Sequence, residues 1–240
     1  MNTKTRGRAA MTRSEAVGML TELKSKFLEG LSLAEIKSVV ALASSKRFAA
    51  NSLITSEGDP AECLYLMLDG NARYYTVSPE GKKIVVRWIR AGELVGGASF
   101  LSEPLEYALS TETVKNCSAL VWDRATIRSL AAAYPRLMEN ALLLAFDYLV
   151  HFRTLHVAMS SQSAPQRLAW VLGYLAKQAG ERVPGGVELD VRNEELAHEA
   201  NVTIFTVSRL LGEWQRKGLI RKSRGRVLLL LPEELIRLEA

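Results

Sequence analysis

Short apolar stretches alternate with turn residues through the first half of the chain. Residues 63–68 and 83–89 are apolar runs of strand length, and residues 71–77 alternate weakly between apolar and polar positions. Glycines separate these stretches at intervals of eleven or twelve residues, at Gly58, Gly70, Gly81 and Gly92. Regular strand-length runs divided by turn glycines predict an antiparallel sandwich or barrel.

Further segments complete this β-rich domain. Ser78 to Gly81 has the composition of a turn, and Asn116 to Trp122 is predicted to form a later strand. A short helix is expected before the strands, around Ala34 to Ala43. We place the domain at residues 20–133. Residues 1–19 are expected to form a flexible tail, with Met11 as an alternative first residue.

The spacing becomes helical after Pro135, a residue type that suits the first turn of a helix. A seam of side chains then recurs at alternating spacings of four and three residues: Met138, Leu142, Ala145, Leu149, Phe152, His156 and Met159. This pattern predicts a helix over residues 134–160 that pairs with a second copy of the chain as a short coiled coil. His156 is interpreted as a polar residue that sets the register rather than as a ligand.

A helix packed only on its own barrel is the alternative explanation of the same pattern. Leu143, Phe146 and Val150 lie outside the seam and are also apolar. We expect both arrangements at once, with this second face on the β-rich domain and the seam on a twin subunit.

Residues 193–211 have the pattern of a helix-turn-helix. Five apolar positions lie where two short crossing helices bury side chains against each other: Leu196, Ala200, Val202, Val207 and Leu210. Asn201 falls at the turn, where a positive φ is needed, and Thr203 is a plausible N-cap for the second helix. The outward face of that helix is predicted to enter the major groove of DNA.

Basic residues gather beyond this motif. Leu219 to Ser223 and Arg226 to Leu231 are predicted to be two strands of a hairpin wing. We expect the wing and the end of the second helix to contact phosphates, while the helix face discriminates bases. The predicted DNA-binding residues are Thr203, Ile204, Phe205, Thr206, Ser208, Arg209, Arg216, Lys217, Lys222, Arg224 and Arg226.

Composition agrees with a DNA-binding protein without establishing one. The chain has 240 residues, is 48% hydrophobic and carries a formal net charge of +5, which favours polyanion binding. Two cysteines are too few for a disulfide framework, and no secretory segment is recognised. The longest apolar runs, at residues 142–146 and 227–231, are too short to cross a bilayer. We therefore expect a cytoplasmic protein with no membrane partner.

The ordered set of motifs resembles the Crp/Fnr family of transcription regulators over almost the whole chain. The residues that carry the resemblance are Phe48, Asn51 to Ile54, Glu57-Gly58, Tyr65, Gly70, Gly81, Gly92 to Gly96, Val207-Ser208-Arg209 and Gly218-Leu219-Ile220. The resemblance implies an α+β chain with a jelly-roll-like antiparallel β-roll, a long dimerisation helix and a winged helix-turn-helix at residues 161–240. It also implies a homodimer that binds promoter DNA and engages RNA polymerase.

The chain departs from cyclic-nucleotide-binding members of that family. Where they carry a glutamate for the ribose, this chain has Gly97, and near their arginine and serine for the cyclic phosphate it has Tyr107 and Ala108. A buried phosphate without such partners costs several kcal/mol, so we expect no familiar cyclic AMP binding. The candidate effector pocket comprises Gly92, Glu93, Gly96, Gly97, Ala98, Ser99, Tyr107 and Ala108.

Other cofactors are constrained by the ligand residues available. Two cysteines cannot supply the four of an iron–sulfur cluster, and no metal site is predicted. Haem stays open, with ligands drawn from His151, His156, His198, Cys63 and Cys117, although ordinary packing explains each of them better.

The expected recognition helix departs from relatives as well. Phe205 stands where Crp-like and Fnr-like members have a glutamate one turn before the arginine that matches Arg209. The acceptor for cytosine N4 is therefore missing, and a half-site other than TGTGA or TTGAT is expected.

Three classes of function remain. A DNA-binding regulator explains every segment, whereas a small-molecule-binding module that does not act through DNA leaves the basic wing unexplained. An enzyme has little support, because no nucleophile elbow, phosphate loop or paired acids occur. A regulator of this kind would need a hinge, which we expect at residues 160–163.

Overall fold

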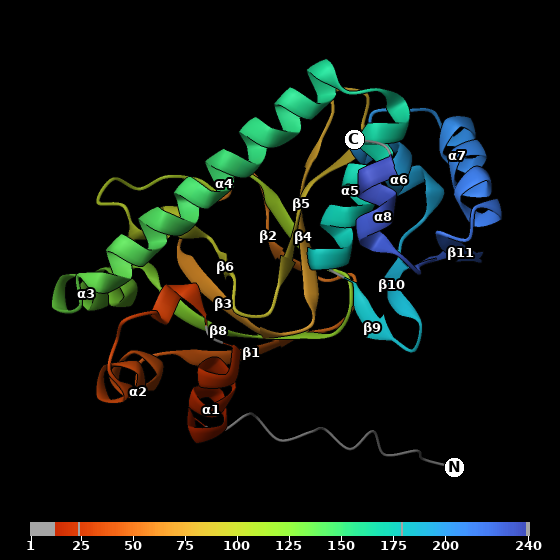
Figure 1. The fold of residues 1–240 in the computed structure, drawn as a ribbon. Helices are drawn as coiled ribbons and strands as arrows, with labels where there is room; N and C mark the ends of the chain where they lie inside the picture. The colour runs from red at the N-terminus through yellow and green to blue at the C-terminus, as the bar shows by residue number, and fades with distance from the viewer. Residues whose placement is uncertain (1–12, 24, 179, 239–240) are drawn as a thin grey trace, which may run out of the picture. The chain divides into compact units, whose positions relative to one another are not determined.

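The computed structural model describes residues 13–23, 25–178 and 180–238. Its contacts divide the chain into two compact units. The first comprises residues 1–70, 91–108 and 113–144, and the second comprises residues 71–90, 109–112 and 145–240. The predicted domain limits at residues 133 and 160 stay predictions. Figure 1 shows the helices and strands of both units.

The first unit combines a β-sheet with helices that cover its core. The sheet has the order β1-β8-β3-β6, with β1 at Ser44–Phe48, β8 at Cys117–Asp123, β3 at Cys63–Asp69 and β6 at Leu94–Val95. The remaining elements of the unit are α1 (Arg13–Leu23), η1 (Lys26–Leu28), α2 (Leu33–Ala41), β2 (Leu53–Thr55), η2 (Gly97–Phe100), α3 (Arg124–Ala133) and the start of α4 (Arg136–Ser161). The predicted strands at residues 63–68 and 116–122 are confirmed as β3 and β8, and the predicted helix at 34–43 as α2.

Its core lies where β3 and β8 meet the helices. The two strands pair antiparallel with Tyr65 opposite Val121, and Trp122 of β8 is buried. The Trp122 indole Nε1 donates to the carbonyl of Val39 in α2 at 2.9 Å. Phe27 meets the Trp122 ring edge-on at 6.3 Å between centroids. A polar indole end satisfied by a helix carbonyl lets the large ring stay buried at little cost.

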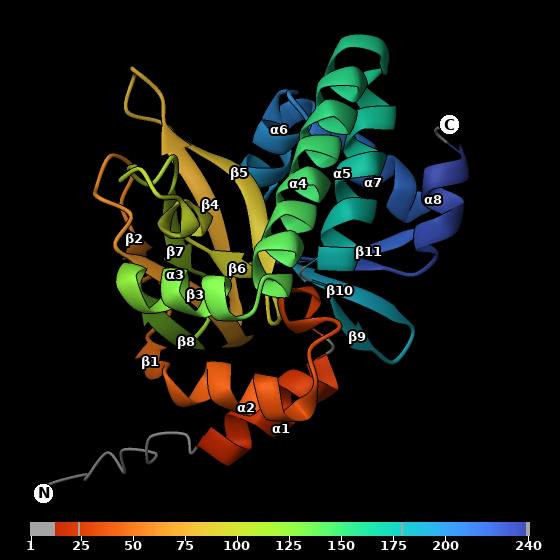
Figure 2. The same cartoon turned by 90° about the vertical axis from the view of Figure 1, so that its left-hand side faces the viewer.

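The predicted tail is wrong for residues 13–19, which belong to α1. Ala16 and Leu20 are buried on one face of this helix, and α1 packs beside α2 (Figure 2). The two buried side chains are four residues apart, which places them on the same side of a helix and stabilises it against the core. Residues 1–12, with the alternative start at Met11, lie outside the described residues.

The turn glycines behave as the spacing predicts. Gly58, Gly70, Gly81 and Gly92 all have φ between 76° and 87°, a region that glycine enters without strain. A Cβ on Gly70 would also meet the carbonyl oxygen of Asn116 at 2.5 Å. Gly70 is therefore required both by its backbone conformation and by close packing.

The second unit contains a β-hairpin and a winged helix-turn-helix. The hairpin strands are β4 (Asn71–Val77) and β5 (Lys83–Arg90), with Asn71 opposite Arg90 and residues 110–112 of β7 (Ser110–Thr113) beside β4. The other elements are α5 (Ala164–Gln178), β9 (Glu181–Val183), β10 (Gly186–Asp190), α6 (Asn193–Glu199), α7 (Ile204–Arg216), β11 (Ile220–Ser223), β12 (Arg226–Leu229) and α8 (Pro232–Leu238). The strands of the wing form a sheet with the order β11-β12-β10-β9.

The long helix α4 has 26 residues and follows Pro135, as predicted. The expected second face is wrong, because Leu143, Phe146 and Val150 are all exposed. The buried side chains of α4 are Leu137, Asn140, Leu144 and Ala158 instead. Successive residues of a helix are about 100° apart around its axis, so Leu143 and Leu144 point in different directions.

By length and composition α4 is the one helix, among the described residues, that could cross a membrane, with a mean hydropathy of 1.2. The expectation drawn from the short apolar runs at residues 142–146 and 227–231 stays a prediction, because α4 reaches this hydropathy with polar and charged residues among its apolar ones. The apolar residues of this helix are interrupted on both sides of residues 142–146, by Asn140 and by Asp147.

Candidate nucleic-acid interface and effector sites

The predicted helix-turn-helix is formed by α6 and α7. Leu196 and Ala200 in the first segment and Val207 and Leu210 in the second are all at most 2% exposed. Asn201 lies between the helices with φ of 48°, as predicted, and its N–H donates to the carbonyl of His198 at 3.2 Å. These side chains hold the two helices together as one motif.

Thr203 caps the N-terminus of α7, as predicted. Its hydroxyl accepts from the backbone N–H of Thr206 at 3.1 Å, and the two threonine hydroxyls lie 2.9 Å apart. The cap satisfies one of the helix's orphan N–H groups. It also begins the helix at Ile204, so that the next side chains project from its first turn.

The outward face of α7 is exposed around those side chains. Phe205 is 87% exposed and Ile204 is 47% exposed, which is unusual for large apolar side chains on a helix with a buried opposite face. Ser208 and Arg209 are exposed as well, and Thr206 is half-buried. Arg209 Nη1 lies 2.7 Å from Glu213 Oε1 on the next turn, a surface pair that a stronger acceptor can replace.

The predicted phosphate-contacting residues lie at the end of α7 and on the wing. Arg216, Lys217 and Arg224 are exposed, whereas Lys222 is half-buried. The Lys222 backbone N–H donates to Gln215 Oε1 at 3.0 Å, so the wing is attached to α7. This attachment fixes the basic wing relative to the exposed helix face.

Arg226 differs from the other wing cations, because its Nη1 lies 3.2 Å from Glu188 Oε1 on β10. The two strands that carry this pair lie side by side, with Glu188 opposite Leu228. Sequence reasoning missed both β9 and β10. Both strands are short and lie around a Pro-Gly-Gly turn, and β9 has only three residues. The alternation Val187-Glu188-Leu189-Asp190 in β10 was the signal that could have found it.

The predicted effector residues lie in the first unit around the turn that follows β6. Gly96 has φ of 85°, and a Cβ there would lie 3.1 Å from Cε1 of Tyr107. The Tyr107 hydroxyl lies 3.0 Å from both the N–H and the carbonyl oxygen of Cys63, from which it accepts and to which it donates. Burial raises the pKa of this phenol. Tyr107 therefore occupies the space beside Gly96 and is bonded to the backbone of β3.

Among the other members of this predicted set, backbone carbonyl groups accept the hydrogen bonds. Ser99 is buried and its hydroxyl donates to the Gly96 carbonyl at 2.8 Å. The carbonyls of Gly92 and Glu93 accept from Ser25 Oγ and from the Met67 N–H respectively. Three further members are at least partly accessible: Gly97, Ala98 and Ala108.

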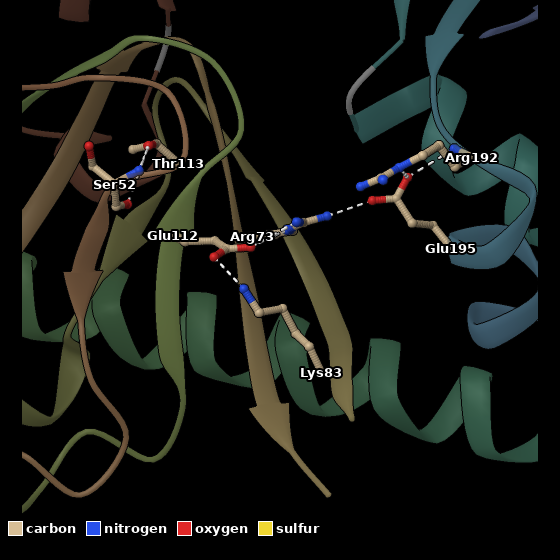
Figure 3. A network of polar contacts seen from close by, with 7 residues as sticks. All are labelled: Ser52, Arg73, Lys83, Glu112, Thr113, Arg192 and Glu195. Atoms are coloured by element: carbon tan, nitrogen blue, oxygen red, sulfur yellow. Dashed lines mark hydrogen bonds and ion pairs between the residues drawn. The ribbon is translucent and has the colours of Figure 1, made fainter. Parts of the chain in front are cut away.

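A polar network that the sequence did not predict connects the hairpin to α6. The Arg73 guanidinium on β4 lies 2.8 Å from Glu112 and 2.7 Å from Glu195 (Figure 3). Lys83 pairs with the same Glu112, and Arg192 lies 3.9 Å from Glu195. Burial raises the pKa of Glu112, but its bonds from Lys83 and Arg73 outweigh that effect and lower it overall.

A second link joins β5 to the end of α6. The Trp88 indole Nε1 donates to Glu199 Oε1 at 2.8 Å. Burial of the Glu199 carboxyl, with the nearby charge of Glu195, raises its pKa to about 7, although the Trp88 bond and Arg73 act in the opposite direction. Glu199 therefore changes charge close to neutral pH.

The predicted dimer seam is largely exposed along α4. Leu142 and Leu149 are 69% and 63% exposed, and Met138 and Phe152 are also exposed apolar side chains. Ala145 and His156 are exposed too, whereas Met159 is half-buried. A stripe of exposed leucine and aromatic side chains of this size indicates an interaction surface.

The described residues contain no group of three or more histidine, cysteine or acidic side chains placed to hold a metal ion. Of the residues considered for haem, His151 stacks on Tyr174 with ring centroids 4.5 Å apart, and His156 is exposed. Cys63 is half-buried at the start of β3 and Cys117 is buried, and neither is in a disulfide.

Comparison with known proteins assigns both halves of the chain. Residues 45–134 match the cyclic nucleotide-binding domain family, and residues 166–238 match the Crp-like helix-turn-helix domain family. FixK2 from Bradyrhizobium japonicum has the same fold, with a TM-score of 0.70 and 19% identity over 82% of this chain and 98% of its own.

Relatives of known role extend over most of the chain. Electron transport regulator A of Shewanella oneidensis is 24% identical over 74% of this chain and 71% of its own length. The CRP-like cAMP-activated global transcriptional regulator of Mycobacterium tuberculosis is 24% identical over 79% of this chain and 85% of its own. The fold, the two matched domains and these relatives agree, and the chain is a member of the Crp/Fnr family of DNA-binding transcription regulators.

Proposed function

We propose that this protein is a homodimeric transcription regulator that binds a near-palindromic DNA site. The observation that carries the proposal is the exposed outer face of α7, where Phe205 and Arg209 project from a helix whose opposite face is buried. A helix held in this way can enter the major groove with its first turns on base edges.

Base discrimination is assigned to the exposed side chains of the first two turns of α7. Arg209 can form a bidentate pair with guanine by leaving Glu213, its present partner at 2.7 Å. Phe205 and Ile204 can contact thymine methyl groups. The exposed Arg216, Lys217 and Arg224 would neutralise phosphates, which fixes orientation and makes affinity dependent on salt.

Dimerisation is assigned to the exposed seam of α4. In an isolated subunit, Leu142 and Leu149 lie in water, and covering each of them is worth about 1.5–3 kcal/mol. A second copy of α4 presents the same spacing of side chains and fits a two-fold symmetric pairing. Two recognition helices would then meet two half-sites.

A membrane-spanning role for α4 is the competing explanation of the same apolar surface. Asp147 and Arg153 both lie exposed on α4, and each costs about 2.5–3.5 kcal/mol at the centre of a bilayer. We therefore propose a cytoplasmic protein in which α4 contacts the α4 helix of a second copy of the chain. RNA polymerase is proposed as a further partner.

The signal is proposed to act through the link between α4 and α5. Helix α4 ends at Ser161 and α5 begins at Ala164, with the Ser163 N–H bonded to Gln166 Oε1 at 2.8 Å. A short capped break of this kind can serve as a hinge. An effector would have to bind one hinge state better than the other.

A selection from random duplex DNA, followed by fluorescence anisotropy across a salt series, tests this function. We expect an inverted repeat with half-sites about one helical turn apart and a half-site other than TGTGA or TTGAT. A small-molecule-binding module that does not act through DNA would enrich no sequence and show no salt-dependent binding, which would reject the proposal.

A further inference from the structure

A cavity of about 210 Å³ lies within the second unit and shares no residue with the predicted effector set. Its walls come from β5, α4, α5 and α6, and the polar and aromatic side chains among them include Arg87, His151, Trp170, Tyr174, His198 and Glu199. Aliphatic side chains such as Leu155 and Val171 complete the lining. An apolar enclosure with a few polar groups directed to it is the usual form of a small-molecule site.

One wall is a stack of aromatic rings. Trp170 and Tyr174 lie on the same face of α5 with an interplanar angle of 1° and ring centroids 5.5 Å apart. His151 of α4 stacks on Tyr174 with centroids 4.5 Å apart and an angle of 25°. Parallel rings present flat faces and edges on which a further planar ring can pack, at about 0.5–1.5 kcal/mol beyond its apolar area.

Arg87 places a fixed positive charge at this cavity. It is only 8% exposed, and its guanidinium carbon lies 3.9 Å from the centre of the Tyr148 ring. A guanidinium stacked on a ring directs its N–H groups within its own plane, where a carboxylate can accept two of them.

His198 supplies a second polar group. Among the described residues, its Nε2 is a buried atom with no hydrogen-bond partner. Buried polar atoms are nearly always hydrogen-bonded, so an unpaired one on a cavity wall suggests a partner that is a ligand or solvent molecule. The lined cavity and this unpaired nitrogen are independent observations that point to the same place.

The balance of charge favours an anion. Burial and the Arg87 charge lower the pKa of His151, which is therefore neutral near pH 7. Glu199 is the acidic group on the wall, and its raised pKa leaves it only partly ionised at that pH. Arg87 is then the largest charge at the cavity.

We propose that this cavity binds a single-ring aromatic carboxylate, with its ring against the Tyr174 stack and its carboxylate on Arg87 and His198. The volume supports this size, because an apolar cavity of about 150 Å³ accommodates benzene. Since α6 is the first helix of the helix-turn-helix, the ligand would stabilise the packing of that helix against β5. Its action as an effector rests on the proposed function, whereas its binding does not.

Isothermal titration with benzoate, phenylacetate and 4-hydroxybenzoate as probes tests the site on the full chain. We expect a dissociation constant below about 1 mM for at least one acid, and at least tenfold weaker binding of its neutral amide. Arg87→Met should weaken the acid at least tenfold. Lys82→Met, which removes an exposed cation of the same hairpin, should leave the affinity unchanged.

A cavity-filling variant gives an independent check. Leu155→Trp should abolish binding while far-UV circular dichroism stays unchanged, and if it does not fold, the acid–amide comparison on the unaltered chain decides. No binding of any probe, or equal affinity for acid and amide, would overturn the proposal. Benzoate binding without any DNA binding would keep the site and reject the regulatory function.

Discussion

Arg73 on β4 and Glu195 in α6 form an ion pair, with Nη1 and Oε1 2.7 Å apart. Both side chains are less than a fifth exposed, so the pair is screened by water less than a surface pair is. It connects the hairpin of the second unit to the first helix of the helix-turn-helix. The orientation of the DNA-binding motif within this unit is thus coupled to a strand far from it in sequence.

Replacing Arg73 should loosen this connection. Arg73→Met leaves Glu112 without one partner and Glu195 without its closest one, and we expect a loss of about 1–3 kcal/mol in unfolding free energy. Lys83→Met is the control within the network, because Lys83 pairs with Glu112 and is 41% exposed, and its other contact is with the Tyr75 ring at 4.1 Å. Urea unfolding measures both variants, and an equal loss in the two would show that the Glu195 pair contributes nothing.

Stability should fall as the pH rises through the Glu199 transition. Its folded pKa of about 7 lies above the ordinary glutamate pKa of about 4.5, so between these values the folded state holds a proton that the unfolded chain releases. The unfolding free energy should therefore decrease from about pH 4.5 to pH 7, by up to about 3 kcal/mol, and then level off.

Glu199→Gln isolates this contribution. The amide oxygen can still accept from Trp88 Nε1, but the side chain no longer titrates. We expect the variant to gain stability over the unaltered chain at pH 8 and to match it near pH 5, as measured by urea unfolding at both values. Parallel pH profiles of the two proteins would exclude Glu199 as the titrating group.

Substitutions in α7 and in the wing should affect DNA affinity in different ways, the first at particular bases and the second on every sequence. Arg209→Ala should weaken the selected site by about 1–3 kcal/mol and relax the preference at one base pair. Arg224→Ala and Lys222→Ala should instead weaken all sequences alike and reduce the salt slope by about 1 each. Anisotropy titrations on selected and scrambled duplexes measure both effects. An unchanged preference after Arg209→Ala would remove Arg209 from base recognition.

Cyclic AMP should not bind at the turn after β6. Tyr107 fills the space beside Gly96 and its hydroxyl is already bonded to the backbone of Cys63, so neither Tyr107 nor Ala108 supplies a cation or a free hydroxyl to a cyclic phosphate. Titration calorimetry with cyclic AMP should give no saturable heat up to about 1 mM. A dissociation constant near 10 μM, about 7 kcal/mol of binding, would contradict this description of the site.

Local patterns predicted the helix-turn-helix, the wing hairpin and the strands β3, β4, β5 and β8. The turn at Asn201 and the cap at Thr203 each depend on one residue and its neighbours, so they follow from sequence alone. The face of α4 did not follow, because Leu143 and Leu144 are equally apolar and only the surrounding structure decides which is buried.

The contacts between distant elements were also beyond sequence reasoning. Arg73 and Glu195 are 122 residues apart, and Trp88 and Glu199 are 111 apart. Nothing in the chain near Glu199 distinguishes it from a surface acid of an amphipathic helix. Its pairing with an indole nitrogen of β5 became visible only in the folded second unit.

Native mass spectrometry of the protein with a duplex carrying its selected site is the decisive test of dimeric DNA binding. We predict a dimer without DNA at micromolar concentration, and a complex of two chains with one duplex. Leu142→Glu with Leu149→Glu should yield folded monomers with much weaker DNA binding, because like charges replace the apolar seam. A monomer that binds one duplex with unchanged affinity, or a dimer that the double substitution leaves intact, would show that α4 is not the dimer interface through which the protein binds DNA.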